Sequence, residues 1–245
     1  MAGSPFLGTN SWLRKPNTNP VATTEVATYE NILQKAGIIL AVAGAGIIAG
    51  WIVNIPALGT VSLIVSIILS FVIGFKRIVN PPLLFIETIF YGFGIGTLSR
   101  MIDAAYPGVV NQSLIGTVVV VALVYILYRF AKFRTTPKIN KILTVALIGY
   151  AALNLVTLIG VMFGLPNWGW SSDIRIAGIP VGVLLGVFAI IMASVVLITD
   201  FESIDAAVIN RQPASVGWFI GYGLVMTILW IYVELLRILS LLQSK

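Results

Sequence analysis

Apolar residues occur along this chain in long runs separated by short polar breaks. A run of about 20 apolar residues is long enough to cross a bilayer as an α-helix. The breaks carry proline, glycine, asparagine or basic residues, which are typical of helix ends. The pattern predicts an all-α integral membrane protein with seven transmembrane helices, at Ile32–Val53, Ala57–Phe75, Leu83–Met101, Ser113–Phe130, Ile142–Phe163, Ala177–Thr199 and Phe219–Leu242.

Two stretches outside these runs are more polar. Residues 1–30 are rich in Ser, Thr, Asn and Pro without apolar periodicity and lack the order of a signal peptide. They predict a flexible cytoplasmic tail ahead of a transmembrane domain at residues 31–245. After the sixth run, FESIDAAVINRQP places Phe201, Ile204 and Val208 at helical spacing, which predicts a short separate helix on the inner membrane surface.

Composition agrees with a membrane protein and narrows the chemistry. Hydrophobic residues make up 58% and charged residues 10% of the 245 residues, and the mean hydropathy is +1.01. Cysteine and histidine are absent, so carboxylates and carbonyls are the available metal-binding groups and no cofactor is expected. The usual nucleophile–base pairs are missing as well, and no GxxxxGK[ST] phosphate loop occurs, so we expect a protein that is neither an enzyme nor driven by ATP.

The formal charge of +6 indicates topology rather than nucleic-acid binding, because the basic residues lie in short loops between the apolar runs. With seven crossings, one side of the membrane holds eleven of them and the other holds four. The positive-inside rule then predicts a cytoplasmic amino terminus and a carboxyl terminus outside the cell membrane. The four basic residues predicted to lie on the outer side are Arg100, Arg175, Arg237 and Lys245.

Glycines four residues apart occur in several of the runs, and this spacing lets two helix backbones approach closely. We interpret it as packing within one chain. The sets are Gly46/Gly50, Gly92/Gly96, Gly160/Gly164, Gly178/Gly182/Gly186 and Gly217/Gly221.

Two acids stand in or beside apolar runs and are the main candidates for a functional site. Asp200 ends the sixth run and Glu234 lies inside the seventh. A charged side chain at bilayer depth costs several kcal/mol, so it usually faces a protein interior or a wet cavity. The alternatives are that Asp200 is only the polar end of its helix and that Glu234 pairs with Arg237, three residues on.

Further charged residues lie toward the same, cytoplasmic face as Asp200. Glu87 is about one turn into the third run, and Lys76 and Arg77 close the second. Glu87 is a third acid that could replace Glu234 as the partner of Asp200. Lys76 or Arg77 is a candidate gating cation, or else serves topology alone.

The segments VVLITDFESI and WIYVELLRILSLL resemble the carboxyl-terminal signatures of the Bax inhibitor-1/YccA family, and ETIFYGFGIGTLS is similar to its third-helix pattern. The likeness extends from about Tyr29 to the end and is closest to the actinobacterial-type branch. It implies six helices around a central seventh. In bacterial relatives it also implies a proton-sensitive calcium leak governed by two facing acids, here Asp200 and Glu234, with Lys76 or Arg77 where relatives carry an arginine that can engage the first acid.

The chemistry of such a pair is plausible in itself. Two carboxylates forced together in an apolar site cannot both ionise cheaply, so they share a proton and titrate as one unit. Calcium needs several oxygen ligands and would favour the ionised pair, so Asp200 and Glu234 are also candidate calcium ligands. A seventh helix that started near Ser215 would place Glu234 too far along its axis, so pairing requires a start nearer Gly221.

The sequence therefore predicts a passive, pH-sensitive calcium leak or channel in the cell membrane. The alternative is a regulator that conducts nothing and binds a membrane partner such as a protease. The other expected contacts are the lipid bilayer, calcium and protons.

Overall fold

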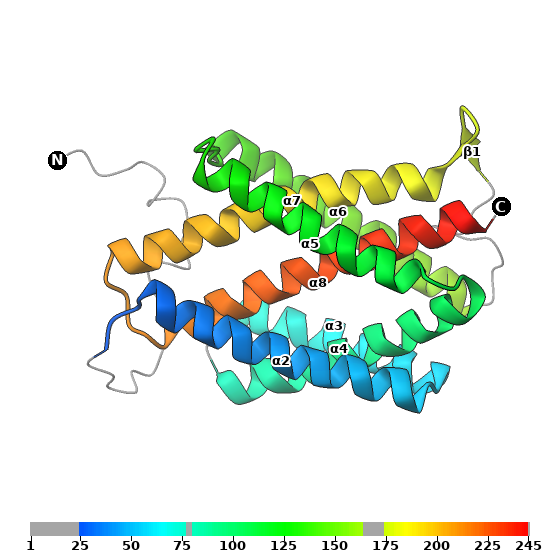
Figure 1. Cartoon of the computed structure of the whole chain (residues 1–245), viewed down its shortest axis with the longest axis horizontal. Coiled ribbons are helices and arrows are strands. Elements are labelled where there is room, and N and C mark those ends of the chain that lie inside the picture. Colours follow the sequence, from blue (N-terminus) through cyan, green and yellow to red (C-terminus); the bar gives the residue numbers. More distant parts are fainter. Residues whose placement is uncertain (1–24, 77–79, 164–173, 245) are drawn as a thin grey trace. The chain divides into compact units, whose positions relative to one another are not determined.

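The computed structural model describes residues 25–76, 80–163 and 174–244, and this part of the chain is almost entirely helical (Figure 1). The helices are α2 (Tyr29–Val53), α3 (Pro56–Lys76), α4 (Pro81–Ala105), α5 (Val109–Arg129), α6 (Pro137–Met162), α7 (Val181–Ile209) and α8 (Val216–Gln243), and the strands are β1 (Arg175–Ile176) and β2 (Ile179–Pro180).

Local signals explain where several helices begin and end. Proline is the first residue of α3, α4 and α6, where its fixed φ suits a helix and its missing N–H breaks no hydrogen bond. The side chain of Thr28 caps α2 by accepting a 3.1 Å hydrogen bond from the backbone N–H of Asn31. At the other end of α2, Asn54 adopts a left-handed conformation with φ 45° and closes the helix.

Each of these helices is long and apolar enough to cross a membrane, which confirms the all-α, seven-span prediction within the described residues. Large apolar side chains are exposed along them, including Ile52 at 74%, Val145 at 71% and Val118 at 69%. Water would make such surfaces costly, whereas lipid tails accept them. The exposed apolar side chains therefore contact the bilayer.

The chain divides into two compact units. Of the described residues, the first contains those up to Ala105 together with Asp200–Thr227, and the second contains those from Tyr106 to Thr199 and from Ile228 on. Both α7 and α8 contribute to each unit. The arrangement of six helices around a central seventh involves both units and stays a prediction.

In the first unit, α4 packs against both α2 and α3. Gly50 of α2 and Gly96 of α4 lie where the two backbones touch, since a Cβ at either position would overlap backbone atoms of the other helix. Thr97 adds a 3.2 Å hydrogen bond from its hydroxyl to the carbonyl oxygen of Gly50. The predicted close packing of glycine-bearing helices is confirmed for this pair.

Three sequence-based predictions for α7 and α8 differ from the structure. The predicted surface helix after Asp200 does not form separately, because α7 continues without a break to Ile209. The apolar spacing of Phe201, Ile204 and Val208 is thus the continuation of the sixth span, and Ile204 is 5% exposed.

The other two differences concern helix starts. The sixth span does not begin at Ala177, because Ala177 and Gly178 form the turn of the β1–β2 hairpin with φ values of 51° and 80° (Figure 1). A glycine that was expected in a helix seam serves this turn instead, since its missing side chain suits a positive φ. The seventh span begins at Val216, three residues before the predicted Phe219, so its start lies nearer Ser215 than Gly221.

Candidate functional site

The three carboxylates that the sequence singled out each lie in a membrane-spanning helix. Glu87 on α4 and Glu234 on α8 are 0% and 2% exposed, and Asp200 on α7 is half-buried. Carboxylates are rare at such positions, and each needs hydrogen-bond donors or a cation nearby. The partners of the three differ in kind.

Asp200 is met by a hydroxyl group. Thr227 of α8 donates a 2.7 Å hydrogen bond from Oγ1 to Oδ2 of Asp200. The same Oγ1 lies 3.0 Å from the carbonyl oxygen of Gly223, one turn earlier. At Gly223 itself, a Cβ would stand 3.6 Å from Oδ1 of Asp200, so the carboxyl group lies close against the α8 backbone.

The position of the Thr227 hydroxyl affects how Asp200 can hold a proton. The Thr227 hydroxyl has one hydrogen and two acceptors, so it cannot point at the Gly223 carbonyl and the Asp200 carboxylate together. When Asp200 is protonated on Oδ2, it donates to Thr227 and Thr227 donates to Gly223, and both contacts become hydrogen bonds. The geometry thus accommodates a proton on Asp200.

No described lysine or arginine pairs with Asp200. The candidate gating cations cannot be placed beside it, because Arg77 and the side chain of Lys76 lie outside the described residues. Their role as a clamp stays a prediction.

Glu87 also has hydroxyl partners. Ser66 and Ser70 of α3 stand one turn apart, and each donates a 2.8 Å hydrogen bond to Oε1 of Glu87. The hydroxyl of Tyr222, on the first part of α8, interacts with both Glu87 and Ser70. Glu87 and Asp200 therefore belong to the same unit, and each contacts the segment of α8 between Tyr222 and Thr227.

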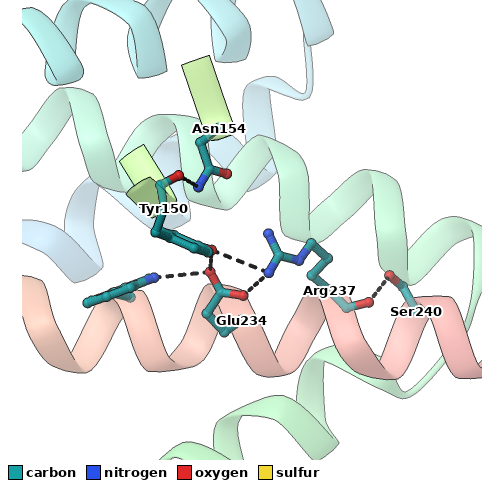
Figure 2. A network of polar contacts seen from close by, with 6 residues as sticks. Tyr150, Asn154, Glu234, Arg237 and Ser240 are labelled. Carbon is teal, nitrogen blue, oxygen red and sulfur yellow. Dashed lines mark hydrogen bonds and ion pairs between the residues drawn. The ribbon is translucent and has the colours of Figure 1, made fainter. Parts of the chain in front are cut away.

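Glu234 has a denser and charged environment in the second unit (Figure 2). Its Oε2 forms an ion pair with Nη2 of Arg237, one turn on in α8. Its Oε1 accepts hydrogen bonds from the hydroxyl of Tyr150 on α6 and, at 3.0 Å, from the indole N–H of Trp230. The pairing with Arg237 that the sequence left open is thus present.

The groups around Glu234 also hold one another. Figure 2 shows the Arg237 guanidinium beside both Glu234 and the hydroxyl of Tyr150, which it reaches at 3.3 Å. The rings of Tyr150 and Trp230 pack with centroids 5.7 Å apart. Because both carboxylate oxygens and the cation are engaged, this network stabilises an ionised Glu234.

The predicted pairing of Asp200 with Glu234 stays a prediction. The two acids have different partners and belong to different units. Thr227 and Glu234 stand seven residues apart on α8, which corresponds to about 10 Å along a helix axis. A calcium site at these acids would also need further ligands, since no group of three acidic side chains gathers within the described residues.

Sequence reasoning missed the uncharged side chains that contact the acids. The signal was present for two of them, since Ser66 and Ser70 put hydroxyls at i, i+4 on one face of an apolar helix. Tyr150, Thr227 and Trp230 had no such signal, because a single tyrosine, threonine or tryptophan is common in membrane helices. Their role depends on which residues α6 and α7 bring beside α8.

Comparison with known proteins gives one clear result. A family model described as "Bax inhibitor 1 like" matches residues 5–244, which is nearly the whole chain. Neither a curated protein nor a solved structure shows a significant match.

Proposed function

Since the chain belongs to the Bax inhibitor 1 like family, we propose that it is a passive calcium leak that responds to pH through Asp200 and Glu234. Calcium and protons are the species that it handles, and calcium is transported rather than held as a resident cofactor. Membership of the family and the seven spans establish a Bax inhibitor 1 like membrane protein, and the leak is the further step that we propose.

The hydrogen bonding of Asp200 carries this proposal. Its partner is a hydroxyl that can donate to the ionised carboxylate, or accept from the protonated acid and donate to the Gly223 carbonyl instead. A carboxyl group with such a partner can take up and release a proton without leaving a buried polar group unpaired. Asp200 is therefore the acid that we assign to the pH response.

A basic residue at the end of α3 completes the mechanism. We propose that Arg77 or Lys76 attracts the ionised Asp200 and favours a closed state. Protonation removes the negative charge and releases this clamp, so the leak increases as the pH falls. Arginine suits the role better, because its planar fork can bind a carboxylate through two hydrogen bonds.

Glu234 has a different part in the proposal. The ion pair keeps the negative charge of Glu234 within α8, and the positive charge of Arg237 neutralises it there. Rearrangement of this pair would free a carboxylate for a passing calcium ion, which prefers oxygen ligands. Protons would compete with calcium for the same oxygens.

The proposed location is the cell membrane, with the basic connections on the cytoplasmic side and the carboxyl terminus outside. Fusion of a reporter that is active only in the cytoplasm tests this orientation. We expect activity at the amino terminus and silence after Lys245. A strong signal from the carboxyl-terminal fusion would reverse the orientation or remove one span.

The function itself is tested with the purified protein in liposomes that contain a calcium-sensitive dye. A leak needs no partner, so calcium should enter protein-containing vesicles faster than empty ones, and faster at acidic than at neutral pH. A folded, correctly inserted protein that passes no calcium at any of these pH values would contradict the leak. It would favour the alternative of a regulator that binds another membrane protein.

A further inference from the structure

A second polar cluster occurs in the first unit, between α3, α4 and the beginning of α8. It consists of the carboxyl group of Glu87 and the hydroxyl groups of Ser66, Ser70 and Tyr222. Glu87 is 0% exposed and Ser66 is 1% exposed. Four oxygen-bearing groups thus converge inside the first unit.

The hydrogen bonding of this cluster is one-sided. Both serine hydroxyls donate to Oε1 of Glu87, whereas Oε2 is buried and has no hydrogen-bond partner among the described residues. No described lysine or arginine pairs with Glu87 either. A buried carboxylate oxygen without a donor or a cation is costly, so the cluster as it stands lacks a positively charged or donating group at Oε2.

A proton alone does not fully satisfy this position. A hydrogen on Oε2 would itself need an acceptor, and Oε2 has no hydrogen-bond partner among the described residues. A bound cation differs, because it needs only oxygen lone pairs. Each serine hydroxyl keeps lone pairs free while it donates to Oε1, and the tyrosine hydroxyl can also accept.

We propose that Ser66, Ser70, Glu87 and Tyr222 form a binding site for a small monovalent cation, with Na⁺ as the ion of suitable charge. One carboxylate balances one positive charge. The ligands are hard oxygens, which suit an alkali cation better than a transition metal. Four protein groups with a single negative charge are too few for Ca²⁺, which takes 6–8 oxygens, so this site is separate from the proposed calcium leak and does not depend on it.

Thermal unfolding of the purified full chain in detergent tests the site. The protein is compared in NaCl and in the same concentration of N-methylglucamine chloride, whose cation is too large for the cluster. A ligand that binds the folded state alone raises the unfolding temperature, so Na⁺ should raise it by several degrees. Binding of radioactive sodium to the same preparation should be saturable.

Variants assign the effect to the cluster. Glu87→Gln keeps the size of the side chain and removes its charge, so both the sodium-dependent shift and the saturable binding should disappear. Glu30→Gln, at an exposed acid on α2, is the matched control and should keep both. Tyr222→Phe removes one oxygen while keeping the ring, and should raise the half-maximal sodium concentration about tenfold.

The outcomes separate cleanly. Equal unfolding temperatures in NaCl and in N-methylglucamine chloride would overturn the proposal. So would a sodium-dependent rise in unfolding temperature that survives in Glu87→Gln. Either result would identify Glu87 as a neutral acid that only joins α3 to α4. If Glu87→Gln does not fold, Tyr222→Phe and Ser66→Ala decide the question in its place. Unchanged sodium dependence in both of these variants would likewise reject the site.

Discussion

Thr227 on α8 donates a 2.7 Å hydrogen bond to Oδ2 of Asp200 on α7. The bond joins the membrane acid to a side chain that can act as donor or acceptor, whereas Glu234 is joined to a fixed cation, Arg237. The two acids that the sequence grouped together are therefore stabilised by different means. Their responses to mutation should differ accordingly.

Thr227→Val should shift the pH response of the calcium leak. Valine has nearly the shape of threonine but no hydroxyl, so the ionised Asp200 loses a donor. Hydrogen bonds to a charged group are stronger than those to a neutral one, so the ionised form loses more than the protonated form. We expect the midpoint of the flux-against-pH curve to move to higher pH by about one unit. Thr227→Ser keeps the hydroxyl and should keep the midpoint, and equal curves for the two variants would contradict this role.

Asp200→Asn should remove most of the pH dependence of calcium flux, because an amide does not titrate in this range. The rate should stay near the acidic wild-type value, since the ionised state can no longer form. If Glu234 acts in the same unit, Glu234→Gln should also flatten the response and the double variant should add little. If Glu234 serves only to pair with Arg237, Glu234→Gln should lower yield or stability and leave the pH response nearly normal. Glu87→Gln belongs in the same series, because Glu87 shares a unit with Asp200.

Replacement of the basic residues at the end of α3 tests the clamp. Arg77→Gln or Lys76→Gln should raise the basal leak near neutral pH, because the proposed attraction between the ionised Asp200 and this cation would be lost. Flux in liposomes at neutral pH measures the effect, and Arg129→Gln, at the last residue of α5, is a control for the loss of one positive charge. Unchanged leak in both single variants and in the double variant would leave these residues with a topological role alone.

Arg237→Met should destabilise the protein by about 3–5 kcal/mol, because it leaves the carboxylate of Glu234 buried without a cation. The double variant Arg237→Met with Glu234→Gln removes the unpaired charge and should recover much of the loss. Thermal unfolding in detergent measures both. Equal instability of the single and double variants would show that packing of the arginine, rather than its charge, supports the second unit.

The α2–α4 contact predicts a sharp difference between glycines of one helix. Gly50→Ala should cost about 1–3 kcal/mol, since its methyl group would overlap the Phe93 backbone of α4. Gly44→Ala should be neutral or slightly stabilising, because nothing lies within 4 Å of the new methyl group and alanine is the better helix former. Similar unfolding temperatures for the two variants would contradict the close contact.

The sequence predicted the helices well because each span must be apolar over its whole length, and that requirement is visible residue by residue. It failed at Asp200, where a charge was interpreted as the end of a span. A half-buried acid with a hydroxyl partner does not end a helix, and the apolar residues after it, such as Ile204 and Ala207, continue the buried face. The partner itself lies 27 residues away in the chain, beyond the reach of any local pattern.

At the candidate site, the sequence likewise indicated the acids but not their hydroxyl partners. Glu87, Asp200 and Glu234 stood out because a carboxylate is costly in a membrane, and that cost depends on residue type alone. The hydroxyl partners did not stand out, because serine and threonine can satisfy themselves on the backbone of their own helix. Their function depends on the rotation of α3 and α8 about their axes, which the sequence does not specify directly.

The continuity of α7 also makes the lipid part of the environment of Asp200. A helix of 29 residues is about 43 Å long, whereas the hydrocarbon core of a typical bilayer is about 30 Å thick. Asp200 stands 19 residues after Val181, about 28 Å along the axis, so a span that starts at one boundary of the hydrocarbon brings this acid close to the other. A thicker bilayer then holds the carboxyl group among acyl chains, and a thinner one exposes it to the headgroups and water. Membrane thickness thereby acts on the same carboxyl group as the proton.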